Sequence, residues 1–215
     1  MIPTECRPNR RNFLKVGAAV ATGVSGLALF SKPAVSQESD RWVIDPKPGF
    51  TPEIGTLTSM LAFTRMQVLA AVKGMSQADL DFLIDGKANT IGALLNHLAA
   101  TEAYYQANSF EGIAWEKFPD ALKQKWDVAM NLGEPARKSI KGNSLDYYLN
   151  LLHQGREKTL SELKKRDDKW LLTVDPDFGA NNFGKWFHVA EHESNHNGQI
   201  KFLKSRVPGA KPTSE

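Results

Sequence analysis

The chain has 215 residues, with 27 Lys and Arg, 24 Asp and Glu, 5 His and a single Cys, so its formal net charge is +3. This basic excess is too small for a nucleic-acid-binding surface, which concentrates positive charge on one face. One Cys excludes both an internal disulfide framework and a zinc cluster built from cysteines. Any metal site in this protein must therefore be built from histidines and carboxylates.

The first 36 residues are organised like an export signal. Basic residues come first, an uncharged run follows at 16–30, and small residues stand at positions 34 and 36. Basic, apolar and small-residue segments in this order are typical of a cleavable signal peptide. The apolar run has 15 residues, whereas a transmembrane helix needs about 20, so no stable membrane anchor is expected after cleavage.

The basic part of this segment contains a more specific motif. Residues 10–15 read RRNFLK, which resembles the twin-arginine export signal. We therefore predict that residues 1–36 are a twin-arginine signal peptide and that the mature protein is exported to the periplasm. The segment contains five basic residues, one acidic residue and the lone Cys6, and its removal leaves 22 basic and 23 acidic residues. The basic character thus belongs to the signal, and no nucleic-acid partner is expected.

The rest of the chain has the hydrophobic pattern of an all-α protein. Residues 37–50 contain two Pro and one Gly without periodicity, which predicts an extended leader. Apolar residues then recur with a helical period. Long helices are predicted at 51–74, 89–107, 144–165 and 182–207, with shorter ones at 76–84 and 120–130. Ser76 and Asp79 predict a capping box, and Asn182 is the expected cap of the last helix. Breaks are expected at Gly133, Pro135 and Gly142, and a loop at 167–184. The prediction is a four-helix bundle over 51–207 with a long crossover between its second and third helices, followed by a polar tail at 208–215.

Three of the five histidines lie on the last predicted helix. His188, His192 and His196 are spaced by four residues, so successive members differ by only about 40° around the helix axis. Their stripe continues into apolar residues and therefore faces the core, where unpartnered imidazoles are costly to bury. Two imidazoles one turn apart can hold a divalent cation from one side. His97, on the second long helix, is placed to complete such a site from across the bundle.

Two segments resemble a known family. Residues 89–105 (NTIGALLNHLAATEAYY) are similar to the second helix of the DinB/YfiT-like superfamily, and residues 188–200 (HVAEHESNHNGQI) are similar to its closing helix. The resemblance covers about residues 51–205. It implies a four-helix bundle whose three histidines hold a divalent metal, usually zinc or nickel. By position, the ligands that it implies are His97, His192 and His196. His188 is an alternative ligand or a residue that supports one.

The same helix also matches a competing motif. His192-Glu193-Ser194-Asn195-His196 satisfies H-E-x-x-H, the zinc-peptidase pattern, in which Glu193 would be the general base. The metzincin extension of that pattern fails, because Gly198 comes one residue early and Phe202 stands where a histidine is needed. A second Glu-x-x-His is missing, which argues against a di-iron bundle. A peptidase is therefore the less favoured alternative.

Three histidines with an open position are typical of a catalytic metal site. Since some DinB-like proteins transfer low-molecular-weight thiols, we predict a metal-dependent hydrolase or thiol-dependent transferase that acts on an unidentified small molecule. Glu193 is the candidate base, and Glu102 and Gln199 are candidate partners of the ligands. Tyr104, Tyr105 and Trp186 are expected to pack in the core, with the alternative that they wall the pocket, and His153 is expected to be structural. A non-catalytic metal-binding stress or interaction protein remains an alternative, and a homodimer remains open. Ligand histidines must be neutral, so ordinary imidazoles predict that metal affinity falls below about pH 6.

Overall fold

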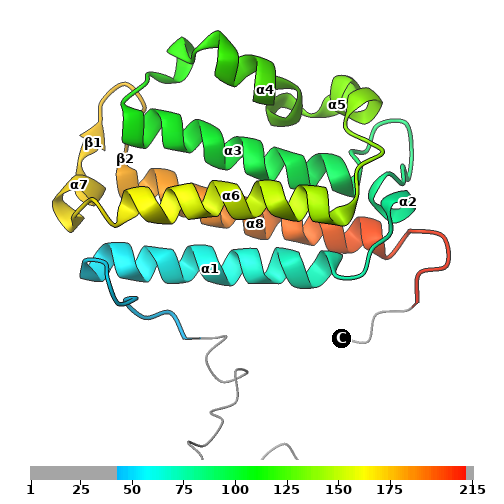
Figure 1. Cartoon of the computed structure of the whole chain (residues 1–215), viewed down its shortest axis with the longest axis horizontal. Coiled ribbons are helices and arrows are strands. Elements are labelled where there is room, and N and C mark those ends of the chain that lie inside the picture. The colour runs from blue at the N-terminus through cyan, green and yellow to red at the C-terminus, as the bar shows by residue number, and fades with distance from the viewer. Residues whose placement is uncertain (1–42, 212–215) are drawn as a thin grey trace, which may run out of the picture. The chain divides into compact units, whose positions relative to one another are not determined.

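The computed structural model describes residues 43–211, so the predicted signal peptide and the first six residues of the leader lie outside the described residues. Four long helices form a bundle, which confirms the all-α prediction (Figure 1). They are α1 (Pro52–Val72), α3 (Ile91–Glu111), α6 (Leu145–Leu163) and α8 (Asn182–Lys204). Helix α1 packs against α8, and α3 packs against both α6 and α8. Within residues 43–211, none of the helices has the length and hydropathy needed to cross a membrane.

The long helices begin at capping residues. The side chains of Thr90 and Ser144 each accept a hydrogen bond from the backbone N–H three residues on, which starts α3 and α6. Helix α8 is capped by Asn181, one residue earlier than the predicted Asn182. Asn182 instead points inward and donates its amide to the carbonyl of Trp170 at 2.9 Å. These caps explain why the predicted and observed helix starts agree to within a residue or two.

Shorter elements connect the long helices. They are α2 (Gln77–Leu80), the 3₁₀ turn η3 (Trp115–Lys117), α4 (Asp120–Asn131), α5 (Gly133–Ser139), α7 (Asp168–Leu172) and a small hairpin of β1 (Val174–Asp175) and β2 (Ala180–Asn181). The long crossover from α3 to α6 is made by η3, α4 and α5, and α4 lies along α3 (Figure 1). The crossover thereby covers one flank of α3.

Two parts of these connections differ from the prediction. Gly133 and Pro135 were expected to break the chain, yet they open α5, because proline is tolerated in the first turn of a helix. The hairpin was expected as loop, since two-residue strands are too short to show alternation. Helix α2 starts at the predicted capping box of Ser76 and Asp79 but ends four residues early. None of these differences changes the bundle.

The core of the bundle consists of two apolar clusters with charged residues between them. On α1, Leu61 belongs to one cluster and Val68 to the other, and the buried Arg65 lies between them. On α3, Glu102 lies in the same way between Leu98 and Tyr105. Burying charges at this level is costly unless they are paired. The middle of the bundle is therefore a polar layer, and the candidate site lies beside it.

Candidate metal centre

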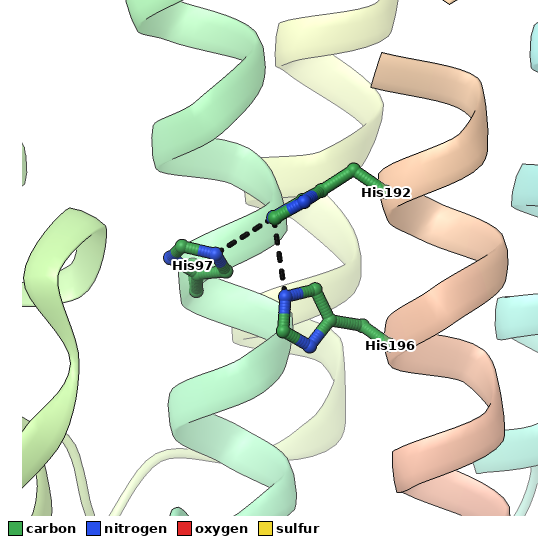
Figure 2. A group of neighbouring side chains, drawn as sticks. All are labelled: His97, His192 and His196. Carbon is green, nitrogen blue, oxygen red and sulfur yellow. Dashed lines mark hydrogen bonds between the residues drawn. The ribbon is translucent and has the colours of Figure 1, made fainter. Parts of the chain in front are cut away.

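The structure brings three of the predicted site residues together. His97 projects from α3, and His192 and His196 project from α8, with their rings converging between the two helices (Figure 2). The Nε2 atom of His192 lies 2.8 Å from Nε2 of His97 and 3.1 Å from Nε2 of His196. His97 and His196 are buried, and His192 is partly buried. Three imidazole nitrogens thus face one point.

The partners of the other ring nitrogens fix two of the tautomers. Nδ1 of His97 lies 2.9 Å from the carbonyl oxygen of Ala129 on α4, and Nδ1 of His196 lies 3.0 Å from Oε1 of Gln199. Both oxygens only accept, so both Nδ1 atoms carry the proton and both Nε2 atoms present a lone pair. His192 can donate at most one proton from its Nε2 atom. This single N–H group cannot form hydrogen bonds to the Nε2 atoms of both His97 and His196. A cation that accepts all three lone pairs would satisfy the whole group.

The spacing of the nitrogens suits a divalent ion. Two nitrogens at the usual zinc distance of about 2.0–2.1 Å and a tetrahedral angle are about 3.3 Å apart. The observed separations of 2.8 and 3.1 Å differ from this by a few tenths of an ångström, and all three atoms lie within 4.8 Å of one another. Ligand histidines are normally oriented by a carbonyl or carboxylate at the other nitrogen, as Ala129 and Gln199 do here. The three residues therefore fit a divalent metal.

Burial keeps these histidines neutral. Desolvation, followed by the nearby imidazole of His196, lowers the pKa of His97 from 6.5 to about 4. Desolvation and the three neighbouring histidines lower the pKa of His192 to about 3, and desolvation also lowers the pKa of His196. A neutral imidazole is the form that binds a metal. The site is consequently ready to bind a cation well below neutral pH.

We expect metal affinity to be nearly independent of pH between 7 and 5. Protons compete only when the pH approaches the lowered pKa values, so the loss of zinc affinity should begin near pH 4 rather than near pH 6. Three ordinary histidines would instead lose on the order of 10⁴-fold in affinity between pH 7 and pH 5. Competition titrations with a zinc chelator at pH 7, 6 and 5 measure this. A steep loss would contradict the burial of the site.

His188 does not belong to the three-nitrogen group. Its side chain is about half exposed, and its Nδ1 lies 3.3 Å from the carboxylate of Glu191. Its ring centroid is 5.3 Å from that of His192 and 5.8 Å from that of Tyr105. His188 thus lies one turn before His192 on α8, beside the site, with the aromatic ring of Tyr105 on α3 as its neighbour.

Glu193 lies in the bundle interior and not at the three histidines. Because it follows His192 directly, its side chain points about 100° away around the helix. Its carboxylate accepts hydrogen bonds from Arg65 Nε and Arg156 Nη2, both at 2.9 Å, and from Thr64 Oγ1 at 3.0 Å. The residue is 1% exposed. Two guanidinium groups occupy its oxygens, so it is placed neither as a general base nor as a solvated acid, and the H-E-x-x-H interpretation loses its base.

Glu102 belongs to the same buried group. It is fully buried and accepts hydrogen bonds from Arg65 Nη2 at 2.8 Å, Arg156 Nε at 2.8 Å and Thr159 Oγ1 at 2.6 Å. Each long helix contributes one member to this charge layer, which we define as Arg65, Glu102, Arg156 and Glu193. Its two arginines are not among the site residues predicted from the sequence. A charged residue on an otherwise apolar stripe was the signal that could have found them.

The other residues singled out from the sequence lie outside the three-nitrogen group. Gln199 does contact a ligand, through the bond to His196. Tyr105 and Trp186 are buried in an apolar cluster, and the Tyr104 hydroxyl donates to Asp127 on α4. His153 is exposed on α6.

Comparison with known protein families identifies the family of the chain. The family model for mycothiol S-transferases matches residues 56–209, which include α3, α6, α8, all of α1 except its first four residues, and the three histidines. The chain belongs to the mycothiol S-transferase family. This family is DinB/YfiT-like, so the predicted resemblance is confirmed at the level of the superfamily. A search of curated proteins found no significant match.

Proposed function

We propose that this protein is an exported, metal-dependent S-transferase that joins a low-molecular-weight thiol, mycothiol or a relative of it, to an electrophilic small molecule. The observation that carries the proposal is the convergence of three Nε2 atoms on one point in a member of this family. The chemistry of three imidazoles favours zinc or nickel. In the reaction the S–H bond of the thiol breaks, a sulfur–carbon bond forms, and the group displaced from the electrophile leaves.

The chain's own residues have limited tasks in this reaction. A divalent cation bound here supplies Lewis acidity that lowers the pKa of a thiol, so that solvent takes the thiol proton. The site then needs no carboxylate base, which agrees with the engagement of Glu193 by Arg65 and Arg156. Ala129 and Gln199 hold two imidazoles in the required tautomer.

Export is supported by the sequence of residues 1–36, with its RRNFLK motif. This motif resembles the signal for the twin-arginine pathway, which transports folded proteins. The metal would therefore be bound before export. N-terminal sequencing of the mature protein from the periplasm tests this part of the proposal, with cleavage expected close to Ser36.

The activity is tested with purified mature protein, zinc or nickel, mycothiol and a chromogenic electrophile such as 1-chloro-2,4-dinitrobenzene. We expect adduct formation above the uncatalysed rate, loss of this rate after chelation, and recovery when the metal is added back. Ester and amide substrates without thiol are assayed in parallel. Thiol-independent hydrolysis would show a hydrolase instead, and metal binding without any turnover would favour a non-catalytic binding protein.

A further inference from the structure

A cavity of about 640 Å³ lies next to the metal centre, between the loop at 84–89 and the C-terminal half of α8. We call it the amide pocket. Its polar lining consists of Asp85, Lys87, Asn89, Asn195 and Gln199, and Phe202 is its aromatic residue. Its volume is in the range that takes a small organic ligand. It exceeds what an amino-acid-sized thiol would fill.

The amide pocket adjoins the three histidines. Gln199 lines the pocket, and its Oε1 atom accepts the hydrogen bond from His196 Nδ1 at 3.0 Å. Across the pocket, Leu94 lies one turn before His97 on α3. Three residues along a helix span about 4.5 Å, so the pocket begins about one turn from the metal ligand on α8. A ligand whose sulfur is at the histidines can therefore reach into it.

The polar groups left unused in the pocket are mainly hydrogen-bond donors. Asn195 Oδ1 already accepts from Gln199 Nε2 at 3.3 Å, and Asn89 Oδ1 accepts from the backbone N–H of Gly133 at 3.1 Å. Within residues 43–211, neither of these two asparagine NH₂ groups donates a hydrogen bond to the protein. The ammonium of Lys87 adds further donors. Asp85 is the carboxylate of the lining, and its Oδ1 already accepts from the backbone N–H groups of Lys87 and Ala88, both at 2.7 Å. The unused donors of the asparagines and Lys87 therefore favour acceptor oxygens.

An apolar surface lies beside these donors. Phe202 is 54% exposed, a large apolar area for a side chain that lines a cavity. Ile84 and Leu94 contribute further apolar lining. A ligand with acceptor oxygens on one side and a less polar face on the other would satisfy both parts.

We propose that the amide pocket is a specificity subsite, which binds an oxygen-rich extension of the thiol substrate while the thiol sulfur lies at His97, His192 and His196. This rests on the proposed S-transferase function. The oxygens are hydroxyl, amide or carboxylate oxygens, and the NH₂ groups of Asn89 and Asn195 donate to them. The subsite makes the protein prefer an extended thiol over a small thiol such as cysteine.

The test is calorimetric binding of mycothiol and of cysteine to zinc-bound protein, comparing wild type with Asn195→Asp. This change keeps an oxygen that accepts from Gln199 but removes the NH₂ donor. We expect mycothiol to bind about tenfold more weakly and cysteine to bind unchanged. Metal-free protein should bind mycothiol weakly, and the variant should lose this binding as well. Asn150→Asp, an exposed position on α6, is the control for the added charge.

The other outcomes separate the two proposals. Unchanged mycothiol affinity in Asn195→Asp would overturn the subsite and leave the S-transferase proposal intact. An equal loss for mycothiol and cysteine would also overturn it, because the change would then act on the metal centre through Gln199. If neither thiol binds zinc-bound wild-type protein, the S-transferase proposal and the subsite fail together. Equal zinc content and equal thermal unfolding midpoints show that the variants are folded.

Discussion

Replacing Arg156 with Met is expected to lower the free energy of unfolding by about 3–5 kcal/mol, because it leaves two buried carboxylates with only one guanidinium between them. Arg156 donates to Glu102 at 2.8 Å, to Glu193 at 2.9 Å and to the carbonyl of Leu61 at 2.6 Å. In the variant, two carboxylates share the single guanidinium of Arg65. The methionine fills much of the volume, so most of the loss comes from the unpaired charge.

The pKa of Glu102 shows how strongly the arginines stabilise its charge. Burial alone would raise this pKa, but Arg156, Arg65 and the hydrogen bonds from Arg156 and Thr159 lower it from 4.5 to about 2. A carboxyl with a lowered folded-state pKa contributes stability above pH 4.5, and this contribution is lost as the pH falls toward 2. In Arg156→Met the carboxyl can take up a proton more easily. The destabilisation should therefore be smaller at pH 4 than at pH 7.

Urea unfolding of metal-free protein at pH 7 and pH 4 measures both effects. The matched control is Lys158→Met, two residues further along α6, whose ion pair with Glu111 spans 3.0 Å between half-exposed side chains. Exposed pairs contribute little, so the control should change stability by less than about 0.5 kcal/mol. If Arg156→Met lowered the free energy of unfolding no more than Lys158→Met does, the ion pairs of Arg156 in the charge layer would not stabilise the fold.

The helices and the histidine cluster were predictable because their signals are local. Apolar periodicity and the caps at Thr90 and Ser144 set the limits of the long helices. The four-residue spacing of the α8 histidines places them on one face whatever the rest of the bundle does. Which of them meets His97 depends on the crossing of α3 and α8, and only the family resemblance indicated His192 and His196. The structure brings these three side chains together.

The environment of Glu193 was not predictable in this way. Its role depends on Arg65, Glu102 and Arg156, which come from three other helices and meet only when the bundle is packed. The H-E-x-x-H motif suggested that Glu193 is a base, but the motif describes only the spacing of residues on one helix. It does not include the residues of other helices that pack against Glu193. The direction of the glutamate side chain is set by its neighbours, and here they hold it inside. Short elements such as α5 and the hairpin escaped prediction for a simpler reason, since they contain too few residues for a periodic signal.

Replacing His192 with Ala is expected to abolish stoichiometric metal binding. His192 is the central member of the group, because its Nε2 atom is the one near both other Nε2 atoms. Even residues that only orient a metal ligand change affinity by about 10–100-fold, so loss of the ligand itself should cost more than about 100-fold. Metal content per chain after dialysis should fall from near one to well below one. Zinc should also no longer raise the thermal unfolding midpoint, since that rise requires binding to the native state.

Two other histidines provide the contrast. His153→Ala removes an exposed imidazole from α6 and should leave metal content unchanged. His188→Ala is the sharper comparison, because His188 shares the stripe with His192 but its Nδ1 faces Glu191 and it lies outside the three-nitrogen group. We expect this variant to keep its metal as well. Loss of metal in His188→Ala would make His188 a ligand, and full retention in His192→Ala would show that other groups bind the ion. A loss confined to His192→Ala is the result that the geometry of the three Nε2 atoms requires.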